Sequence, residues 1–516
     1  MKFSSRRLAT TPLLLAFVVV QITPAEAAVK NQKPPIIKAG FAETDITPDI
    51  GMERPGGYGK VFHRSFHDSC KVRAAVFDDG TRRVALVGID TLVVPRYTVL
   101  EARAEIQKRC GIKPEAVLIG ASHSHSSGPV GMVQPGEYDH ASPLVQDLAY
   151  NKSSMADRGF MLRLKSQIVN AVCQADRTRV EVKVGVGSGH EDKVAFNRRL
   201  RMKGGLTFSH PSPGNPDILG YAGPIDPEVG VIGTWDMEGK LTGVIVNYAC
   251  HATTSPGGIS ANWIHYLEQT IRGALNSPVL PVVFLQGACG DITQVDNLAP
   301  YARPASEQWA RRVGGRVGAE AVKVLLMVNQ APGSDIPIDF RQRVWDVKRR
   351  VPSPERVKRS HELVRKTPKE VGATSWIFAK EIVMLEAQIA KRAEVEVEVQ
   401  AIQVGPAVFV SNPAEYFVQY GLDIKKGSKF PFTFPVELAN GCVGYVPTEE
   451  ALGPNGGGYE TRISSYSNLE VSAGRQFADT GIELANEMSP GKTPVPPPAP
   501  PFRAPWAYGA TPPETR

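Results

Sequence analysis

Short aliphatic runs, rich in β-branched residues and each followed by a polar or glycine-rich turn, recur along the chain. They lie at 82–90, 116–122, 243–250, 281–289 and 406–415. Because these runs are apolar at successive positions rather than alternate ones, both of their faces are expected to be buried, as in the central strands of a covered sheet. The pattern therefore predicts a sheet in the interior of the protein.

Segments with the spacing of helices separate these predicted strands, for example 97–110 and 305–328. Segment 342–395 combines a strongly basic stretch with helical spacing, and we interpret it as a helical insertion over the sheet. In the next residues, 393–404, apolar and polar side chains alternate, which predicts a half-exposed strand. Strands that alternate with helices predict an α/β fold class, here a mixed sheet core covered by helices in a single large domain.

The two ends of the chain differ from this pattern. Basic residues, an apolar run at 13–20 and the small residues near Ala27 predict a signal peptide over 1–27, so we expect export after cleavage. The apolar run is shorter than a membrane span. Residues 489–516 are rich in proline and poor in aliphatic residues, which predicts a disordered tail. The predicted catalytic domain is 28–488.

Composition narrows the function classes. The net charge of +7 is spread without a dense block of lysine and arginine, so nucleic acid is not an expected partner. The motifs HExxH, GxSxG and GxxxxGK[ST] are absent, which argues against a thermolysin-like protease, an α/β-hydrolase and a phosphate-binding loop. Six cysteines in an exported chain permit disulfides, but their pairing stays open, and Cys250 and Cys289 are as readily buried thiols as bridges.

Histidines follow two of the predicted strands. In "ASHSHSSGP" (121–129), His123 and His125 stand two residues apart, so in extended chain both face the same side. In "NYACHATT" (247–254), His251 follows the second strand. Each histidine alone has an ordinary interpretation, as an exposed turn residue or a satisfied core residue. Ligands in α/β sheets bind at loops past the strand ends, and that placement favours a shared site.

A carboxylate completes the candidate set, because Glu415 follows the strand predicted at 406–411. Alone, it is as well explained by the start of a helix. Two histidines and one glutamate from separate strand ends are, however, the ligand set of a catalytic zinc site that keeps one position for water. Zinc lowers the pKa of such a water to about 7. The sequence thus predicts Zn2+ as cofactor.

At this point the motifs resemble those of the neutral ceramidase family. Seven segments occur in the family's order over about residues 36–487: "AGFAETDITPDIG" (39–51), "ASHSHSSGP" (121–129), "FNRR" (196–199), "NYACHATT" (247–254), "FLQGACGDITQ" (284–294), "NPAEYF" (412–417) and "GYVPTEE" (444–450). Members of this family are zinc amidases, secreted or at the membrane surface, that split ceramide into sphingosine and a fatty acid. The resemblance implies a ceramidase-like catalytic domain, a lipid or small-molecule amide substrate and peripheral contact with a membrane surface.

The resemblance also implies roles for individual residues. The zinc ligands would be His123, His251, Glu415 and Tyr445. His125 would be the partner of the zinc-bound water and act as the base. The catalytic set would be completed by Arg198, Tyr459 and Thr293. Arg198 and Tyr459 match family residues expected to stabilise the oxyanion of the tetrahedral intermediate.

Several positions depart from the family pattern. Thr293 stands where the family has a serine that is important for activity, Asn262 replaces an expected aspartate, and Cys442 replaces an aromatic residue. The proline-rich tail stands where ceramidases have an immunoglobulin-like domain. Two alternatives to ceramide hydrolysis therefore remain: hydrolysis of a smaller N-acyl compound, lactone or ester on the same scaffold, and a zinc-binding homologue without catalysis. The sequence leaves the acyl-chain length and the oligomeric state open.

Overall fold

The computed structural model describes residues 1, 36–328, 330–332, 336–496, 498–503 and 506–516. Apart from Met1, the predicted signal peptide lies outside the described residues, so its cleavage and export stay predictions. In the described part of the chain, no helix is both long and apolar enough to cross a membrane.

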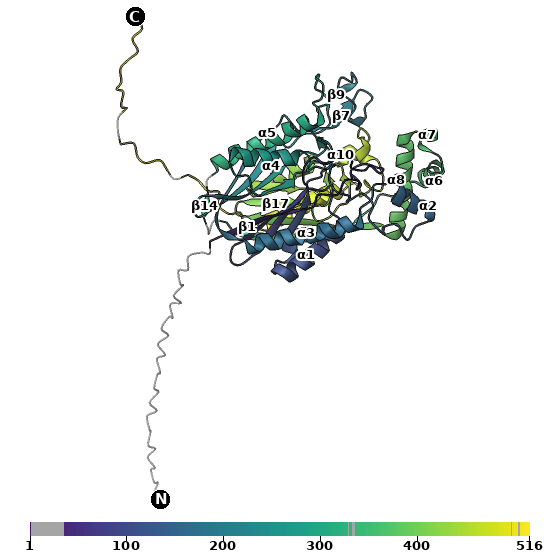
Figure 1. The fold of residues 1–516 in the computed structure, drawn as a ribbon, viewed down its shortest axis with the longest axis horizontal. Coiled ribbons are helices and arrows are strands. Elements are labelled where there is room, and N and C mark those ends of the chain that lie inside the picture. The colour runs from purple at the N-terminus through teal and green to yellow at the C-terminus, as the bar shows by residue number, and fades with distance from the viewer. Residues whose placement is uncertain (2–35, 329, 333–335, 497, 504–505) are drawn as a thin grey trace. The chain divides into compact units, whose positions relative to one another are not determined.

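A nine-stranded mixed sheet holds the main core of the described chain (Figure 1). Its path runs β12-β11-β10-β5-β1-β2-β3-β4, and β14 pairs with β5. The pairs β3–β4 and β11–β12 are parallel, and the other pairs along the path are antiparallel. The strands are β1 Lys38–Asp45, β2 Lys71–Asp78, β3 Arg83–Ile89, β4 Val117–Ala121, β5 Val180–His190, β10 Glu228–Asp236, β11 Leu241–Tyr248, β12 Val282–Gln286 and β14 Ala331–Pro332.

Smaller sheets complete the strand layer. One has the order β15-β16-β17-β19, and two of the others are the pair β18–β20 and the group β8-β7-β9. Their bounds are β15 Ile338–Lys348, β16 Glu394–Val404, β17 Ala407–Ser411, β19 Phe432–Val436, β18 Glu415–Tyr416, β20 Tyr445–Val446, β7 Arg199–Met202, β8 Thr207–Ser209 and β9 Ile218–Tyr221. The short strands β6 Phe196–Asn197 and β13 Ile292–Thr293 pair with each other. The strands predicted at 82–90, 116–122, 243–250, 281–289, 393–404 and 406–415 are confirmed as β3, β4, β11, β12, β16 and β17.

Helices lie on both sides of the large sheet. Figure 1 shows α4 and α5 above the strands and α1 and α3 below them. The helices are α1 Arg96–Cys110, α2 Pro143–Gln146, α3 Arg158–Arg177, α4 Trp263–Ala274, α5 Ser306–Met327, α6 Pro354–Leu363, α7 Pro368–Val371, α8 Ala373–Lys391, α9 Val418–Gly427, α10 Glu449–Leu452 and α11 Ala473–Asn486. The predicted helices at 97–110 and 305–328 are confirmed as α1 and α5, and with them the mixed α/β fold.

The helical insertion needs one correction, because its first part is a strand. Residues 342–348 belong to β15, which pairs with β16 along its whole length. Helices begin only at Pro354 and end at Lys391. Local spacing could not reveal this, since the pairing partner of 342–348 lies about fifty residues later in the chain and the many charges mask the strand's alternation.

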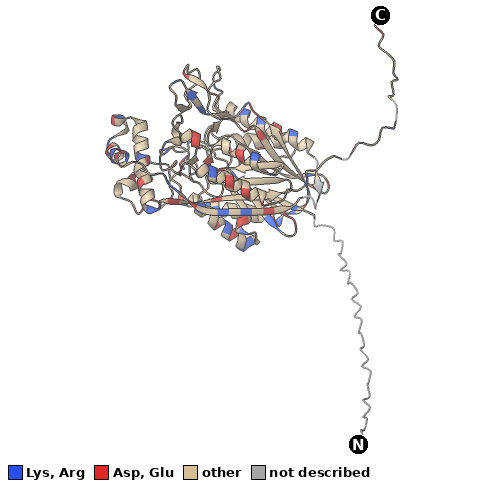
Figure 2. Cartoon of the chain, turned by 180° about the vertical axis from the view of Figure 1, so that it is seen from behind, with Lys and Arg blue, Asp and Glu red and all other residues tan. Residues whose placement is uncertain are grey.

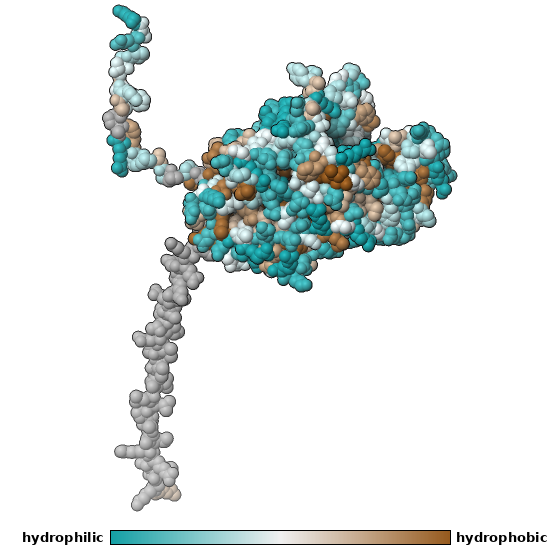
Figure 3. All heavy atoms as spheres, in the orientation of Figure 1, coloured by the Kyte–Doolittle hydropathy of each residue, from teal (hydrophilic) through white to brown (hydrophobic). Residues whose placement is uncertain are grey.

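Charge and hydropathy are finely mixed on the views shown. Figure 2 shows basic and acidic residues interspersed along the helices and strands. On the face shown in Figure 3, hydrophobic residues lie in small groups within a mainly hydrophilic surface. Figure 2 agrees with the scattered charge of the sequence.

One disulfide is present among the described residues, between Cys110 and Cys173. It joins the end of α1 to α3, a pairing that the sequence left open. Cys250 and Cys289 are buried free thiols, which decides between the two interpretations that the sequence allowed.

Close packing brings the two parallel strand pairs together, although they lie near opposite ends of the sheet path. Strand β3 contacts β12, and a Cβ added at Gly88 would lie 2.2 Å from the carbonyl oxygen of Phe284. Only glycine allows two backbones to approach so closely. The loops that follow β4 and β11 consequently meet at one place.

Candidate active site

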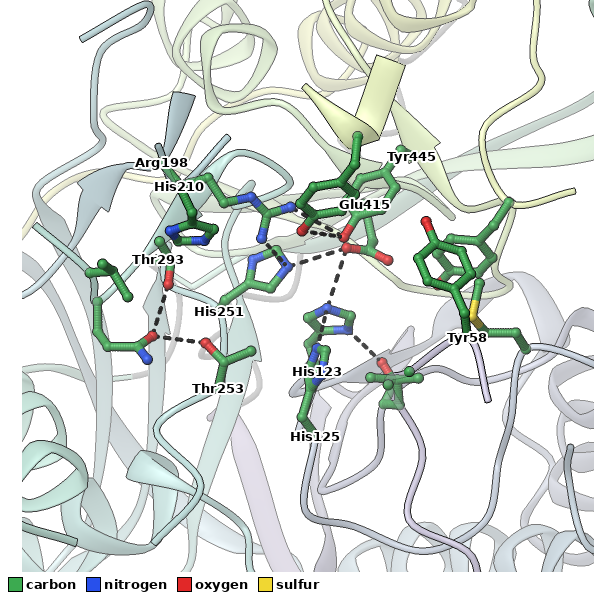
Figure 4. Close-up of a pocket in the computed structure, with 18 of the residues that line it drawn as sticks. Tyr58, His123, His125, Arg198, His210, His251, Thr253, Thr293, Glu415 and Tyr445 are labelled. Atoms are coloured by element: carbon green, nitrogen blue, oxygen red, sulfur yellow. Dashed lines mark hydrogen bonds and ion pairs between the residues drawn. The ribbon is translucent and has the colours of Figure 1, made fainter. Parts of the chain in front are cut away.

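A cavity of about 510 Å³ lies where the loops after β4 and β11 meet. All eight residues predicted for the site line it: His123, His125, Arg198, His251, Thr293, Glu415, Tyr445 and Tyr459. Figure 4 shows most of them pointing into one space. The structure thus brings the whole predicted set together, while the role of each residue stays a prediction.

The rings of His123 and His251 are both oriented by backbone carbonyls. Nδ1 of His123 donates to the carbonyl oxygen of Leu92 at 2.9 Å, and Nδ1 of His251 donates to that of Cys289 at 2.7 Å. A carbonyl can only accept, so Nδ1 carries the proton and Nε2 is left with its lone pair. Each Nε2 lies 3.3 Å from Oε2 of Glu415.

Glu415 reaches the site because β18 pairs in parallel with β20, in a register that sets it beside Tyr445. Its Oε2 is buried and accepts no hydrogen bond from the described atoms. Burial opposes ionisation of Glu415, but His123 and His251 hold its pKa well below its usual range. A buried carboxylate oxygen without a hydrogen-bond donor, facing two imidazole nitrogens, is an environment that favours a cation.

The two histidines that face Glu415, His123 and His251, have pKa values shifted in opposite directions. Burial lowers the pKa of His123, but the Glu415 carboxylate outweighs this and raises it overall. Burial, Arg198 and His123 lower the pKa of His251 to about 3. Without a metal ion, a second proton on Nε2, which makes His123 a cation, would satisfy the Glu415 carboxylate. A metal ion between the rings would take over that role, because it would accept the same lone pairs.

The donor set therefore fits a metal ion. Ligand nitrogens of His123, His125 and His251 all lie within 4.8 Å of one another, and this group, in which His125 is half-buried and the other two are buried, could hold a metal. Glu415 adds an oxygen donor to it. Imidazole and carboxylate ligands suit several divalent ions, so the geometry alone does not select one.

His125 packs against the other two histidines. Its Nε2 lies 3.2 Å from Nε2 of His123. Burial, together with His123 and His251, lowers its pKa well below the usual value, so it is a neutral imidazole. On the other side of the ring stands Gly56, with φ at +98°, where an added Cβ would lie 2.2 Å from Nδ1 of His125. Only glycine fits there.

Arg198 connects several groups of the cavity wall through its guanidinium. Its guanidinium donates to Glu460 at 2.7 Å, to the carbonyl oxygen of Gly290 at 2.7 Å and to the Tyr445 hydroxyl at 3.2 Å. It also lies 3.1 Å from Nε2 of His251. The hydroxyls of Tyr445 and Tyr459 are 3.4 Å apart, and burial raises the pKa of both, so each is a neutral hydrogen-bond donor. The cavity thus combines a fixed cation with two phenols.

The departures from the family pattern fall at different places. The Thr293 hydroxyl donates to Gln294 at 2.9 Å, and the side chain lines the cavity. Asn262 instead caps α4, where its side chain accepts from the amides of Trp263 and Thr254 at 3.0 Å each. Asn262 does not line this cavity, so its departure affects a helix end and not the cavity wall.

Several lining residues were missed from the sequence: Tyr58, His210, Arg303 and Trp309. Tyr58 had a detectable signal, since "PGGYG" (55–59) is a glycine-rich turn of the kind that approaches a ligand. For His210, whose pKa burial lowers to about 4, no pattern in the sequence marked the position.

Comparison with known proteins finds similarity both in sequence and in structure. No protein-family model matches the chain. The chain is 26% identical over 359 residues to the neutral ceramidase of Pseudomonas aeruginosa, a match that covers 65% of this chain and 48% of that protein. It therefore spans about half the length of this relative.

Two of the similar solved structures are a crystal structure of neutral ceramidase from Pseudomonas aeruginosa and a ceramidase complexed with C2. The first has a TM-score of 0.64 at 19% identity, and the second 0.62 at 17%. Each comparison covers 90% of this chain and 77% of the other. The resemblance predicted from the motifs is confirmed, and the fold is shared.

Proposed function

Because the chain is related to the neutral ceramidases in sequence and fold, we propose that it is a metal-dependent hydrolase of an N-acyl amide. The observation that carries this proposal is the convergence of Nε2 of His123 and Nε2 of His251 on Oε2 of Glu415, with each nitrogen 3.3 Å from that oxygen. Their lone pairs meet in a cavity large enough for a small molecule.

Zinc is the ion that we propose, held by His123, His251 and Glu415, with Tyr445 as the further ligand implied by the family. Two imidazoles and a carboxylate are a common protein ligand set for catalytic zinc. When bound, zinc would polarise the amide carbonyl and supply a water that ionises near neutral pH.

The residues of the chain then carry the proton transfers and the charge. His125 is neutral, and its Nε2 faces the cluster, so it would accept a proton from the attacking water and later donate it to the leaving amine. Arg198 and the neutral hydroxyl of Tyr459 would donate hydrogen bonds to the oxygen on which negative charge develops.

Two substrate classes are candidates for this cavity. The sequence relative, a neutral ceramidase, supports ceramide as the substrate. His210 and Arg303 give part of the lining a polar or charged character, and Thr293 adds a methyl group where the family has serine. These side chains favour a smaller or more polar N-acyl compound as the second candidate.

The test is hydrolysis by purified, zinc-loaded protein. Ceramides of several chain lengths are offered beside short N-acyl amines and simple esters, and metal is removed and restored with a chelator and zinc. His123→Ala should lose both zinc and activity, whereas His190→Ala, a substitution of an exposed histidine, should keep both. Cleavage of long-chain ceramide supports the first class, and cleavage of the small amides alone supports the second. Bound zinc without turnover of any substrate would refute the hydrolase.

We also propose that the protein is exported, on the strength of the pattern over residues 1–27. N-terminal sequencing of the protein recovered outside the cytoplasm should begin at Ala28. Recovery of only the full-length chain inside the cell would contradict this.

A further inference from the structure

A buried ammonium group stands in the helical insertion, next to the candidate active site. Lys380 of α8 is 0% exposed. Its Nζ donates to the carbonyl oxygen of Tyr58 at 2.6 Å, to the Ser153 hydroxyl at 2.7 Å and to the carbonyl oxygen of Lys152 at 3.3 Å. The carboxylate of Glu381 lies 3.2 Å away. Burying a cation is costly unless all its donors are satisfied, and here three acceptors and one anion do so.

The Tyr58 carbonyl belongs to the loop that supports His125. Two residues earlier, Gly56 leaves no space for a Cβ beside Nδ1 of His125. The Tyr58 ring lines the cavity, and Figure 4 shows it across Glu415 from Arg198. Residues 56–58 therefore contact the candidate base and present a side chain to the substrate space.

Helix α8 holds this loop at a second point. The ring of Phe378, two residues before Lys380, lies 5.8 Å from the ring of Tyr58, measured between centroids. The guanidinium of Arg462 in turn stacks on the Phe378 ring, with its central carbon 3.5 Å from the ring centroid. The insertion thus contacts both the backbone and the side chain of Tyr58.

We propose that Lys380 is a positioning residue of the candidate active site, which holds residues 56–58 against His125 and aims the Tyr58 side chain into the substrate space. The inference rests on the proposed function and extends it, because it makes the helical insertion a working part of the site. A displacement of about 1 Å in such a constellation can lower the rate about 100-fold.

The test compares Lys380→Met with Lys369→Met. The control lysine lies on the insertion too, in α7, and is exposed. Lys380→Met should speed hydrogen–deuterium exchange in peptides covering 54–60 while exchange in the sheet strands stays as in the wild type. It should lower kcat for the cleaved amide on the order of 10- to 100-fold, with a smaller effect on KM and with metal content unchanged. Lys369→Met should change none of these.

The exchange measurement keeps this inference separate from the proposed function. If the wild type cleaves no substrate, the proposed hydrolase fails, but local exchange at 54–60 still decides the positioning role. Unchanged exchange at 54–60 in Lys380→Met would overturn that role, and so would exchange that rises equally throughout the protein. If Lys380→Met does not fold, Phe378→Ala removes the second contact of α8 to Tyr58, and faster exchange confined to 54–60 is again expected.

Discussion

The ion pair between Arg198 and Glu460 gives the sharpest quantitative expectation. Both side chains are buried, with relative exposures of 3% and 0%, and Nε of Arg198 lies 2.7 Å from Glu460. Arg198→Met leaves a buried carboxylate without its cation, and the carbonyl of Gly290 without a donor. Breaking a buried pair by removing one partner costs about 3–5 kcal/mol. We expect Arg198→Met to lower the free energy of unfolding by about that amount.

A double-mutant cycle tests whether the pair itself is the cause. Glu460→Gln alone leaves Arg198 uncompensated and should also be costly. In the double variant neither charge is left unpaired, so its cost should be smaller than the sum of the single costs by about 0.5–3 kcal/mol. Urea unfolding followed by circular dichroism, in metal-free and zinc-loaded protein, measures all four forms. Arg311→Met is the matched control, because Arg311 forms a solvent-exposed pair with Glu307, and such pairs contribute little to stability.

Activity adds an independent readout of Arg198. Because its guanidinium contacts Tyr445 and His251 as well, Arg198→Lys should fold better than Arg198→Met but still lose about 100- to 1000-fold in kcat, the usual effect of removing an oxyanion donor. An unfolding midpoint of Arg198→Met equal to that of the wild type would refute the energetic reasoning. A double variant whose cost equals the sum of the singles would refute the coupling.

Three further outcomes are expected. Reduction of the Cys110–Cys173 disulfide, which spans 63 residues, or its replacement by two serines should cost about 4 kcal/mol of stability in the chain-entropy model, measured by urea unfolding. Burial raises the pKa of Glu268, but Arg73 and its neighbouring cations outweigh this and lower it to about 2 from 4.5. Its contribution, about 3 kcal/mol, is thus present above pH 4.5 and is lost as the pH falls toward 2, and the loss should be absent from the acid unfolding curve of Glu268→Gln. Thr293→Val loses one neutral hydrogen bond and should lower kcat/KM for the cleaved amide by about fivefold.

Each of these has a contrary result. A reduced protein that unfolds at the same urea concentration as the oxidised one would contradict the role of the disulfide. Identical acid unfolding curves for wild type and Glu268→Gln would contradict the ion-pair argument. A loss of all activity in Thr293→Val, with zinc retained, would make the hydroxyl a catalytic group.

Much of the strand and helix pattern was determined by the sequence itself. An uninterrupted aliphatic run removes its apolar side chains from water only when both of its faces are buried. Strands β3, β4, β11 and β12 were therefore recognisable from local residues. The histidines and Glu415 were recognisable as candidates because they directly follow such runs, where α/β sheets bind ligands. Their assignment as a ceramidase-like set came from the order of the motifs.

Only the tertiary structure decided which of these strand ends meet. The contact of β3 with β12 at Gly88 joins the loops of His123 and His251, and the pairing of β18 with β20 sets Glu415 beside Tyr445. Strand β15, the Cys110–Cys173 pairing and the burial of Lys380 were equally hidden. Each depends on a partner far away along the chain, and periodicity within a short window carries no information about that partner.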